Sequence, residues 1–308
     1  MTSQRRAEAL LLAATVIWGS TFVVTKGILD VASPLAYTSI RFILAALIVR
    51  FLFSGSAFSA RRGVVAPGVV LGLLLFAGFA FQTIGLQYTS ASKSAFFTGM
   101  LVVFTPIFHI AAQKWFSLPQ KALLTGNIVG VVCSAAGIFL LSSPDGGGFS
   151  QGDAMTLAAA ALFAIYIVYL DTSSRNVETM PLTFIVFLTC GVAGGLGALL
   201  TEEIRIVFGI DFYLPLAYLT IFATVIALGV QNRFQADTTP TRAAVIFSLE
   251  PVIAAVFAFL VRGEQLGPVG VAGGAIIFGG LILSELSEYI PILRRPIARG
   301  RNVSVKEI

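Results

Sequence analysis

The chain alternates long uncharged stretches with short polar segments. A helix that crosses roughly 30 Å of hydrocarbon needs about 20 mostly apolar residues. Eight stretches without Asp, Glu, Lys or Arg are long enough, and two further apolar spans each hold one internal charge, Arg41 or Glu250. The ten spans are 9–25, 34–53, 63–92, 94–113, 122–144, 154–170, 179–201, 212–232, 241–261 and 265–284. This pattern predicts an all-α integral membrane protein with ten transmembrane helices.

Composition strengthens this prediction and narrows the chemistry. Only 11% of the residues are charged, whereas soluble domains carry about 25%, so no soluble domain fits between the spans. Cys133 and Cys190 lie inside apolar spans without a CxxC spacing, which favours neither a disulfide nor a metal site. We therefore expect no metal and no cofactor.

The positions of Lys and Arg predict the orientation. With the N-terminus inside, the inner loops and the tail hold 15 of the 20 basic residues and the outer loops hold four. Short cytoplasmic loops carry such an excess, so we expect both termini to be cytoplasmic. Arg5 and Arg6 precede the first span as in a signal peptide, but no small-residue cleavage site follows. The basic tail suits an anionic lipid surface. Because the basic residues of the chain lie at the ends of apolar segments and do not form one patch, they do not indicate a nucleic-acid partner.

The second half of the sequence repeats the first at a shift of about 145 positions. Thr105-Pro106 falls on Glu250-Pro251, and Pro34-Leu35 falls on Pro181-Leu182. The predicted division is a first repeat at 1–143, a linker at 144–152, a second repeat at 153–288 and a tail at 289–308. Five helices per repeat is an odd number, so the second copy enters the membrane from the opposite side. Transporters with such inverted repeats bind substrate near the midplane.

Several motifs resemble the paired EamA domains of the drug/metabolite transporter superfamily. They are the segments 17–22 (IWGSTF), 40–47 (IRFILAAL), 248–252 (SLEPV) and 262–266 (RGEQL). The sequence resembles in particular the YddG-type exporters of aromatic and other neutral amino acids. The resemblance implies a ten-helix secondary transporter with a central cavity, in a bacterial inner membrane. One departure is that the first repeat has SLPQ at 117–120 where the second has RGEQ at 262–265.

Two charged residues lie deep inside predicted spans. Glu250 is about nine residues, or 13 Å, into its span, and Arg41 is about seven residues, or 10 Å, into its own. An intramembrane charge is a functional candidate by default. Glu250 would carry a proton or anchor a substrate ammonium, or else be a protonated structural carboxyl. Arg41 would bind a substrate carboxylate, pair with Glu250, or clamp neighbouring groups structurally.

Uncharged side chains complete the candidate substrate site. Aromatic rings can line a cavity for flat apolar groups, although each is also an ordinary core or lipid-facing candidate. His109 is either a proton relay or a packed imidazole. The candidate substrate-binding residues are Trp18, Arg41, Gln82, Phe97, Phe104, Phe163, Tyr166, Gln231 and Glu250.

The function that these features favour is export of small neutral metabolites, above all bulky neutral amino acids, by alternating access. The alternatives are export of drugs or of nucleotide-sugar-like metabolites, and an integral membrane enzyme. No GxxxxGK[ST], HExxH or GxSxG motif occurs, and no ring of charges suggests a channel. The expected partners are a small-molecule substrate and membrane lipid. Ten spans with an internal twofold form a pathway within one chain, which allows a monomer.

Overall fold

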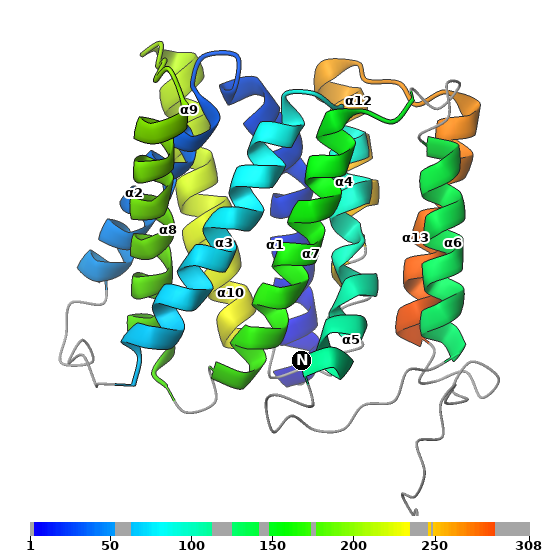
Figure 1. The fold of residues 1–308 in the computed structure, drawn as a ribbon, viewed down its shortest axis with the longest axis horizontal. Coiled ribbons are helices and arrows are strands. Elements are labelled where there is room, and N and C mark those ends of the chain that lie inside the picture. The colour runs from blue at the N-terminus through cyan, green and yellow to red at the C-terminus, as the bar shows by residue number, and fades with distance from the viewer. Residues whose placement is uncertain are drawn as a thin grey trace, which may run out of the picture.

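The computed structural model describes residues 3–52, 63–112, 125–141, 148–173, 177–234, 246–247 and 249–286, and these residues form a helical bundle without a sheet (Figure 1). The first half contains α1 (Ser3–Ile28), α2 (Pro34–Leu52), α3 (Val65–Leu86), α4 (Ala91–Gly99), α5 (Leu101–Ala112) and α6 (Thr125–Leu141). The second half contains α7 (Gln151–Ser173), α8 (Thr179–Thr201), α9 (Ile210–Tyr218), the π-helix η4 (Leu219–Ile226), α10 (Ala227–Phe234), α12 (Glu250–Arg262) and α13 (Pro268–Leu286).

Seven helical segments of the described chain are long and apolar enough to span a membrane. They are Gln4–Ile28, Pro34–Leu52, Val65–Leu86, Ala91–Ala111, Gln151–Leu170, Thr179–Thr201 and Ile210–Gln231. Each matches one predicted span. The other three predicted spans correspond to α6, α12 and α13, whose apolar described parts are not among these seven segments, and part of the span 241–261 lies outside the described residues. The helical membrane class is therefore confirmed, whereas the count of ten spans stays a prediction.

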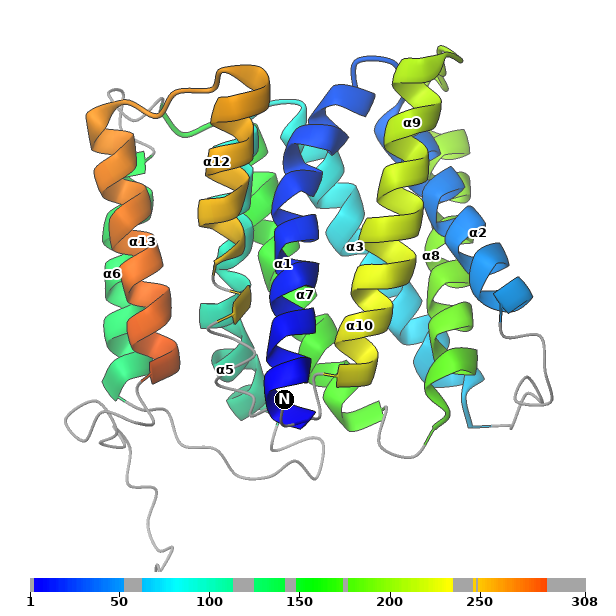
Figure 2. The same cartoon turned by 180° about the vertical axis from the view of Figure 1, so that it is seen from behind.

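Consecutive spans run in opposite directions through the bundle (Figures 1 and 2). α3 packs between α7 and α8, α2 packs on α8, and α1 packs on α12. α6 and α13 form a pair at one side, with their backbones in close approach. A Cβ added at Gly137 would lie 2.5 Å from the carbonyl oxygen of Gly273, and one added at Gly273 would lie 2.7 Å from that of Gly137. Glycine is needed at both positions because small residues allow membrane helices to approach closely.

Two spans depart from regular α-helix. α4 and α5 are separated at Met100, and α9, η4 and α10 together form one span whose middle is a π-helix. A π-helix bonds each N–H to the carbonyl five residues earlier, and such segments often occur at functional sites. This irregular middle packs against α1 and α2, where the sequence places Trp18 and Arg41.

Candidate functional site

Arg41 is a buried cation with neutral partners. Its side chain lies on α2 with 4% of the residue exposed. Nε donates to the Thr224 hydroxyl at 2.8 Å and Nη1 donates to the Tyr37 hydroxyl at 3.1 Å. The guanidinium carbon also lies 5.4 Å from the ring centre of Phe42 and 5.1 Å from that of Phe79. No described carboxylate pairs with it, so the arrangement provides hydroxyls and π-faces but no counter-charge.

The π-helix places the Thr224 hydroxyl for this contact. Thr224 Oγ1 donates to the carbonyl oxygen of Leu219, five residues earlier, at 2.9 Å. Its lone pair remains free to accept from Arg41. On the same element, Thr220 Oγ1 is buried without a hydrogen-bond partner among the described groups. η4 therefore carries one hydroxyl that accepts a hydrogen bond from Arg41, on Thr224, and one without a described partner, on Thr220.

Trp18 contacts both the π-helical span and the segment that precedes Glu250. Its indole N–H donates to the carbonyl oxygen of Ala223, next to Thr224, at 3.0 Å. Its ring lies at 5.8 Å from the ring of Phe247, three residues before Glu250. The Ser20 and Tyr218 hydroxyls are 2.7 Å apart and join α1 to the same span. Trp18 thus lies between the element that contacts Arg41 and the segment that leads to Glu250.

Glu250 is the first residue of α12, which begins near mid-height of the bundle (Figure 2). α1 and α4 both pack tightly beside it. A Cβ added at Gly99 would lie 2.9 Å from Pro251, and one added at Gly19 would lie 2.6 Å from Ile253. Glu250 is a partly buried residue, and its carboxyl group makes no hydrogen bond or ion pair with any described residue. The predicted ion pair with Arg41 is not formed in this structure.

Gln82 lies in the region of Glu250. Its Nε2 on α3 donates to Thr98 Oγ1 on α4 at 3.1 Å, and Thr98 precedes the Gly99 that faces Pro251. This contact makes Gln82 a polar group at the junction of α3, α4 and α12.

The other candidates divide between two core clusters. Phe163 and Tyr166 pack in the cluster that contains Phe42, and the rings of Phe163 and Phe79 lie 5.4 Å apart beside Arg41. Phe97 is fully buried in a second cluster, where Phe104 packs against it from the edge. These two phenylalanines therefore pack toward α13 and α6 and away from Arg41. Gln231 is partly buried on α10, and His109 is partly buried on α5.

Four contact residues were not among the sequence candidates: Tyr37, Phe79, Thr98 and Thr224. Tyr37 precedes Arg41 by four positions, so helical spacing alone would have placed it beside the guanidinium. Thr224 comes from a span about 180 residues away, and no local signal links it to Arg41.

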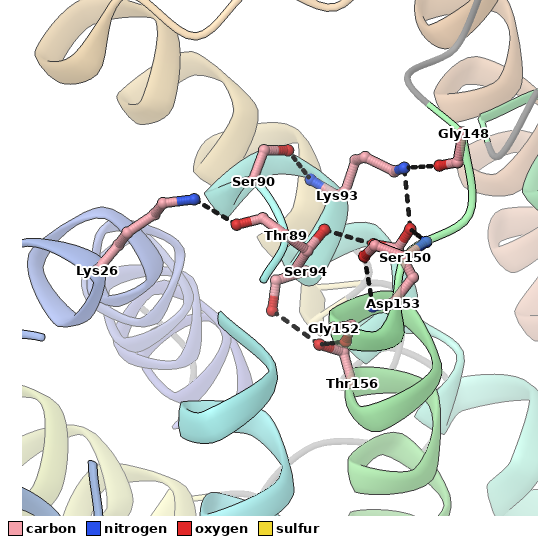
Figure 3. Close-up of polar contacts among 10 residues, drawn as sticks. All are labelled: Lys26, Thr89, Ser90, Lys93, Ser94, Gly148, Ser150, Gly152, Asp153 and Thr156. Atoms are coloured by element: carbon pink, nitrogen blue, oxygen red, sulfur yellow. Dashed lines mark hydrogen bonds and ion pairs between the residues drawn. The ribbon is translucent and has the colours of Figure 1, made fainter. Parts of the chain in front are cut away.

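At one end of the bundle, polar contacts join helices of the two halves, as Figure 3 shows. This is the end where α1 finishes and α2 begins, here called the outer end because the predicted topology places it outside. Lys93 Nζ lies 2.9 Å from the Asp153 carboxylate, and both side chains are buried. The Thr89 hydroxyl donates to the same carboxylate, and Lys26 donates to the Thr89 carbonyl oxygen.

A surface groove of about 480 Å³ lies between α1, α9 and α12 at the outer end. Its lining is Val23, Val24, Gly27, Pro215, Val261 and Arg262.

In the described part of the chain, no three His, Cys, Asp or Glu side chains gather as metal ligands. The polar chemistry near mid-height therefore rests on Arg41, Glu250 and the neutral groups around them.

The model of the EamA-like transporter family matches residues 5–143 and again 150–286. The chain belongs to this family. It is 31% identical over 280 residues to an "Uncharacterized transporter" of Archaeoglobus fulgidus, covering 91% of this chain and 86% of that one. It is 27% identical over 299 residues to a "Probable amino-acid metabolite efflux pump" of Salmonella typhimurium, covering 91% and 95%.

A solved structure described as "Crystal structure of protein" superposes with a TM-score of 0.66 at 18% identity, over 92% of this chain and 97% of that one. This likeness concerns the fold alone. The family match and the long apolar helices make this chain an integral membrane protein of a transporter family.

Proposed function

We propose that this family member is a secondary exporter of neutral amino acids with bulky apolar or aromatic side chains. The proposal includes ten helices in two inverted five-helix repeats, at 1–143 and 153–288 with the linker at 144–152, and cytoplasmic termini. The two family matches and the alternating helix directions support this arrangement. The protein works in this proposal by alternating access around a midplane cavity.

One observation carries the choice of cargo: a buried cation and a partly buried acid lie on elements that both pack near Trp18, whose indole contacts Ala223 beside the Arg41 partner Thr224 and Phe247 shortly before Glu250, and neither charge has a described counter-ion. A zwitterionic amino acid supplies the opposite charges. Its carboxylate would bind Arg41, its ammonium would bind Glu250, and its side chain would contact Trp18. Phe163, Tyr166 and Gln82 are proposed to complete the cavity wall, whereas Phe97 and Phe104 would support it from behind.

Two further points favour amino acids over the alternatives. The Salmonella typhimurium relative is named as an amino-acid metabolite efflux pump. A nucleotide sugar carries phosphates that call for several Lys or Arg side chains, and Arg41 is the only cation inside the predicted spans away from their ends.

Uptake of labelled phenylalanine into proteoliposomes tests the proposal. Three competitors separate the two charges: phenylalanine, phenethylamine without the carboxylate, and 3-phenylpropionate without the ammonium. We expect Arg41→Gln to weaken competition by phenylalanine and phenylpropionate and to leave phenethylamine unaffected. Glu250→Gln should weaken competition by phenylalanine and phenethylamine only.

Matched controls use exposed residues of the same charge, Arg205→Gln and Glu203→Gln, which should transport as the unchanged protein does. No saturable uptake of any neutral amino acid by the folded protein would refute the cargo. The same preparation would then be tested with drugs and nucleotide sugars.

A further inference from the structure

Glu264 connects the end of α12 to the beginning of α4. It follows α12 by two residues, and its carboxylate accepts hydrogen bonds from the backbone N–H of Ala91 at 3.1 Å and of Ser92 at 3.2 Å. The Ser92 hydroxyl donates to it as well, at 3.2 Å. These amides belong to the first turn of α4, whose N–H groups lack helical acceptors and carry partial positive charge.

Glu202 makes the same kind of contact elsewhere at the outer end. It directly follows α8, and its carboxylate accepts from the backbone N–H of Leu35 at 2.8 Å and of Ala36 at 3.2 Å. Those amides form the first turn of α2. Each contact joins the C-terminal end of a second-half helix to the N-terminal end of a first-half helix, and both lie at the same end of the bundle (Figure 1).

The repeat shift relates the helices that each contact joins. Pro34-Leu35 aligns with Pro181-Leu182, so α2 corresponds to α8, and Thr105 aligns with Glu250, so the span of α4 and α5 corresponds to that of α12. A twofold axis in the membrane plane would repeat both contacts at the inner end. The residues needed there are absent from the sequence: Glu264 aligns with Pro119, and Glu202 aligns with Gly55.

The same absence extends along both inner segments. Residues 53–62 and 113–124 contain no Asp or Glu; they lie outside the described residues, and the comparison concerns their sequence only. These two segments therefore supply no carboxylate for contacts equivalent to those of Glu202 and Glu264 at the inner end. At the outer end, Lys26 Nζ lies 4.0 Å from Glu264 Oε1. The Lys93–Asp153 ion pair, drawn in Figure 3, is a second contact between the two halves of the chain.

We propose that Glu202 and Glu264 are latches that hold the outer end closed, and that their absence from the inner end sets the resting transporter open to the inside. This inference rests on the inverted-repeat arrangement under Proposed function. Charge-assisted bonds to helix amides are stronger than neutral ones. Breaking both latches weakens all five of the hydrogen bonds to the two carboxylates in the outward-closed state alone, so it shifts the population toward outward-open. A resting state open to the inside suits export because the cargo loads there.

A cysteine reporter on α4 measures closure without any cargo. Ser94 is fully buried, two residues below the Glu264 contact, with its hydroxyl 3.3 Å from that of Thr156. In a background with Cys133 and Cys190 replaced by alanine, Ser94→Cys is labelled from outside with a membrane-impermeant maleimide. We expect Glu264→Gln or Glu202→Gln to raise the labelling rate about tenfold each, and the double variant to exceed both.

Glu203→Gln is the matched control because its side chain is exposed at the same end and only its carbonyl oxygen contacts Ser33. It should leave the rate unchanged. Glu264→Asp keeps the charge but shortens the reach, and should fall between the parent and Glu264→Gln. Unchanged labelling in monodisperse Glu202→Gln and Glu264→Gln proteins would overturn the latch proposal even if amino-acid transport is confirmed. Faster labelling without amino-acid transport would keep the latch and reject the cargo.

Discussion

Arg41 and Glu250 are opposite charges near the middle of one bundle, and their surroundings differ. Arg41 is held by two hydroxyls and two aromatic faces from three elements, α2, α3 and η4. Glu250 stands at the start of α12, and its carboxyl group contacts no described polar side chain. Four described contacts therefore hold the cation, whereas no described hydrogen bond or ion pair holds the acid. On the proposed function, we therefore expect the Arg41 side of the site to position the cargo and the Glu250 side to be the responsive one.

The largest effect is expected from removing the fixed cation. Arg41→Gln leaves the Thr224 and Tyr37 hydroxyls without their donor and removes the proposed carboxylate ligand. We expect transport to fall by about a hundredfold, since a buried charged hydrogen bond contributes about 1.5–3 kcal/mol. Initial uptake rates in proteoliposomes measure this loss. Arg41→Lys keeps the charge without the planar fork and should recover part of the rate; full activity of both variants would show that Arg41 does not contact the cargo.

Glu250→Gln tests the responsive side. The side chain keeps its shape but cannot ionise, so transport should fall about tenfold or lose its pH dependence. Thermal stability should change little, because no described hydrogen bond depends on the carboxylate. Uptake is measured across pH 5 to 9, together with the melting temperature of the purified protein. Normal transport at every pH by a stably folded variant would leave only a structural role for Glu250.

The sequence predicted one side of this comparison better than the other. Uncharged stretches predicted the seven long spans because hydrocarbon excludes charge, and that signal is local. Arg41 and Glu250, the two charges deep inside predicted spans, were found for the same reason. The Thr224 partner of Arg41 was missed because it approaches Arg41 only through tertiary packing and a π-helical turn. Hydrophobic periodicity along the sequence predicts neither of these. Phe97 and Phe104 were chosen as aromatic residues that could line a cavity, but with 26 phenylalanines in the chain residue type does not reveal which face a ring occupies.

Two threonines of the π-helix, Thr224 and Thr220, give a matched pair of variants that tests how Arg41 is held. Thr224→Val removes a hydroxyl that Arg41 uses, at nearly constant volume, and should cost about 1–3 kcal/mol of stability because the guanidinium N–H is left without an acceptor. Transport should decrease less than in Arg41→Gln. Thr220→Val removes the buried hydroxyl without a described partner and should be neutral or stabilising. Equal melting temperatures for the two variants would show that the Thr224 contact does not hold Arg41 in place.

The smallest effect concerns the residue that lies between the two sides. Trp18→Phe removes the indole N–H that donates to Ala223 but keeps an aromatic ring that can face Phe247. A single neutral hydrogen bond contributes about 1 kcal/mol, so we expect a fall of a few fold in transport. Trp18→Leu also removes the aromatic surface offered to the cargo, and should discriminate against phenylalanine more than against leucine. If Trp18→Leu lowers uptake of both amino acids equally, Trp18 supports the position of η4, and the cargo side chain binds elsewhere in the cavity.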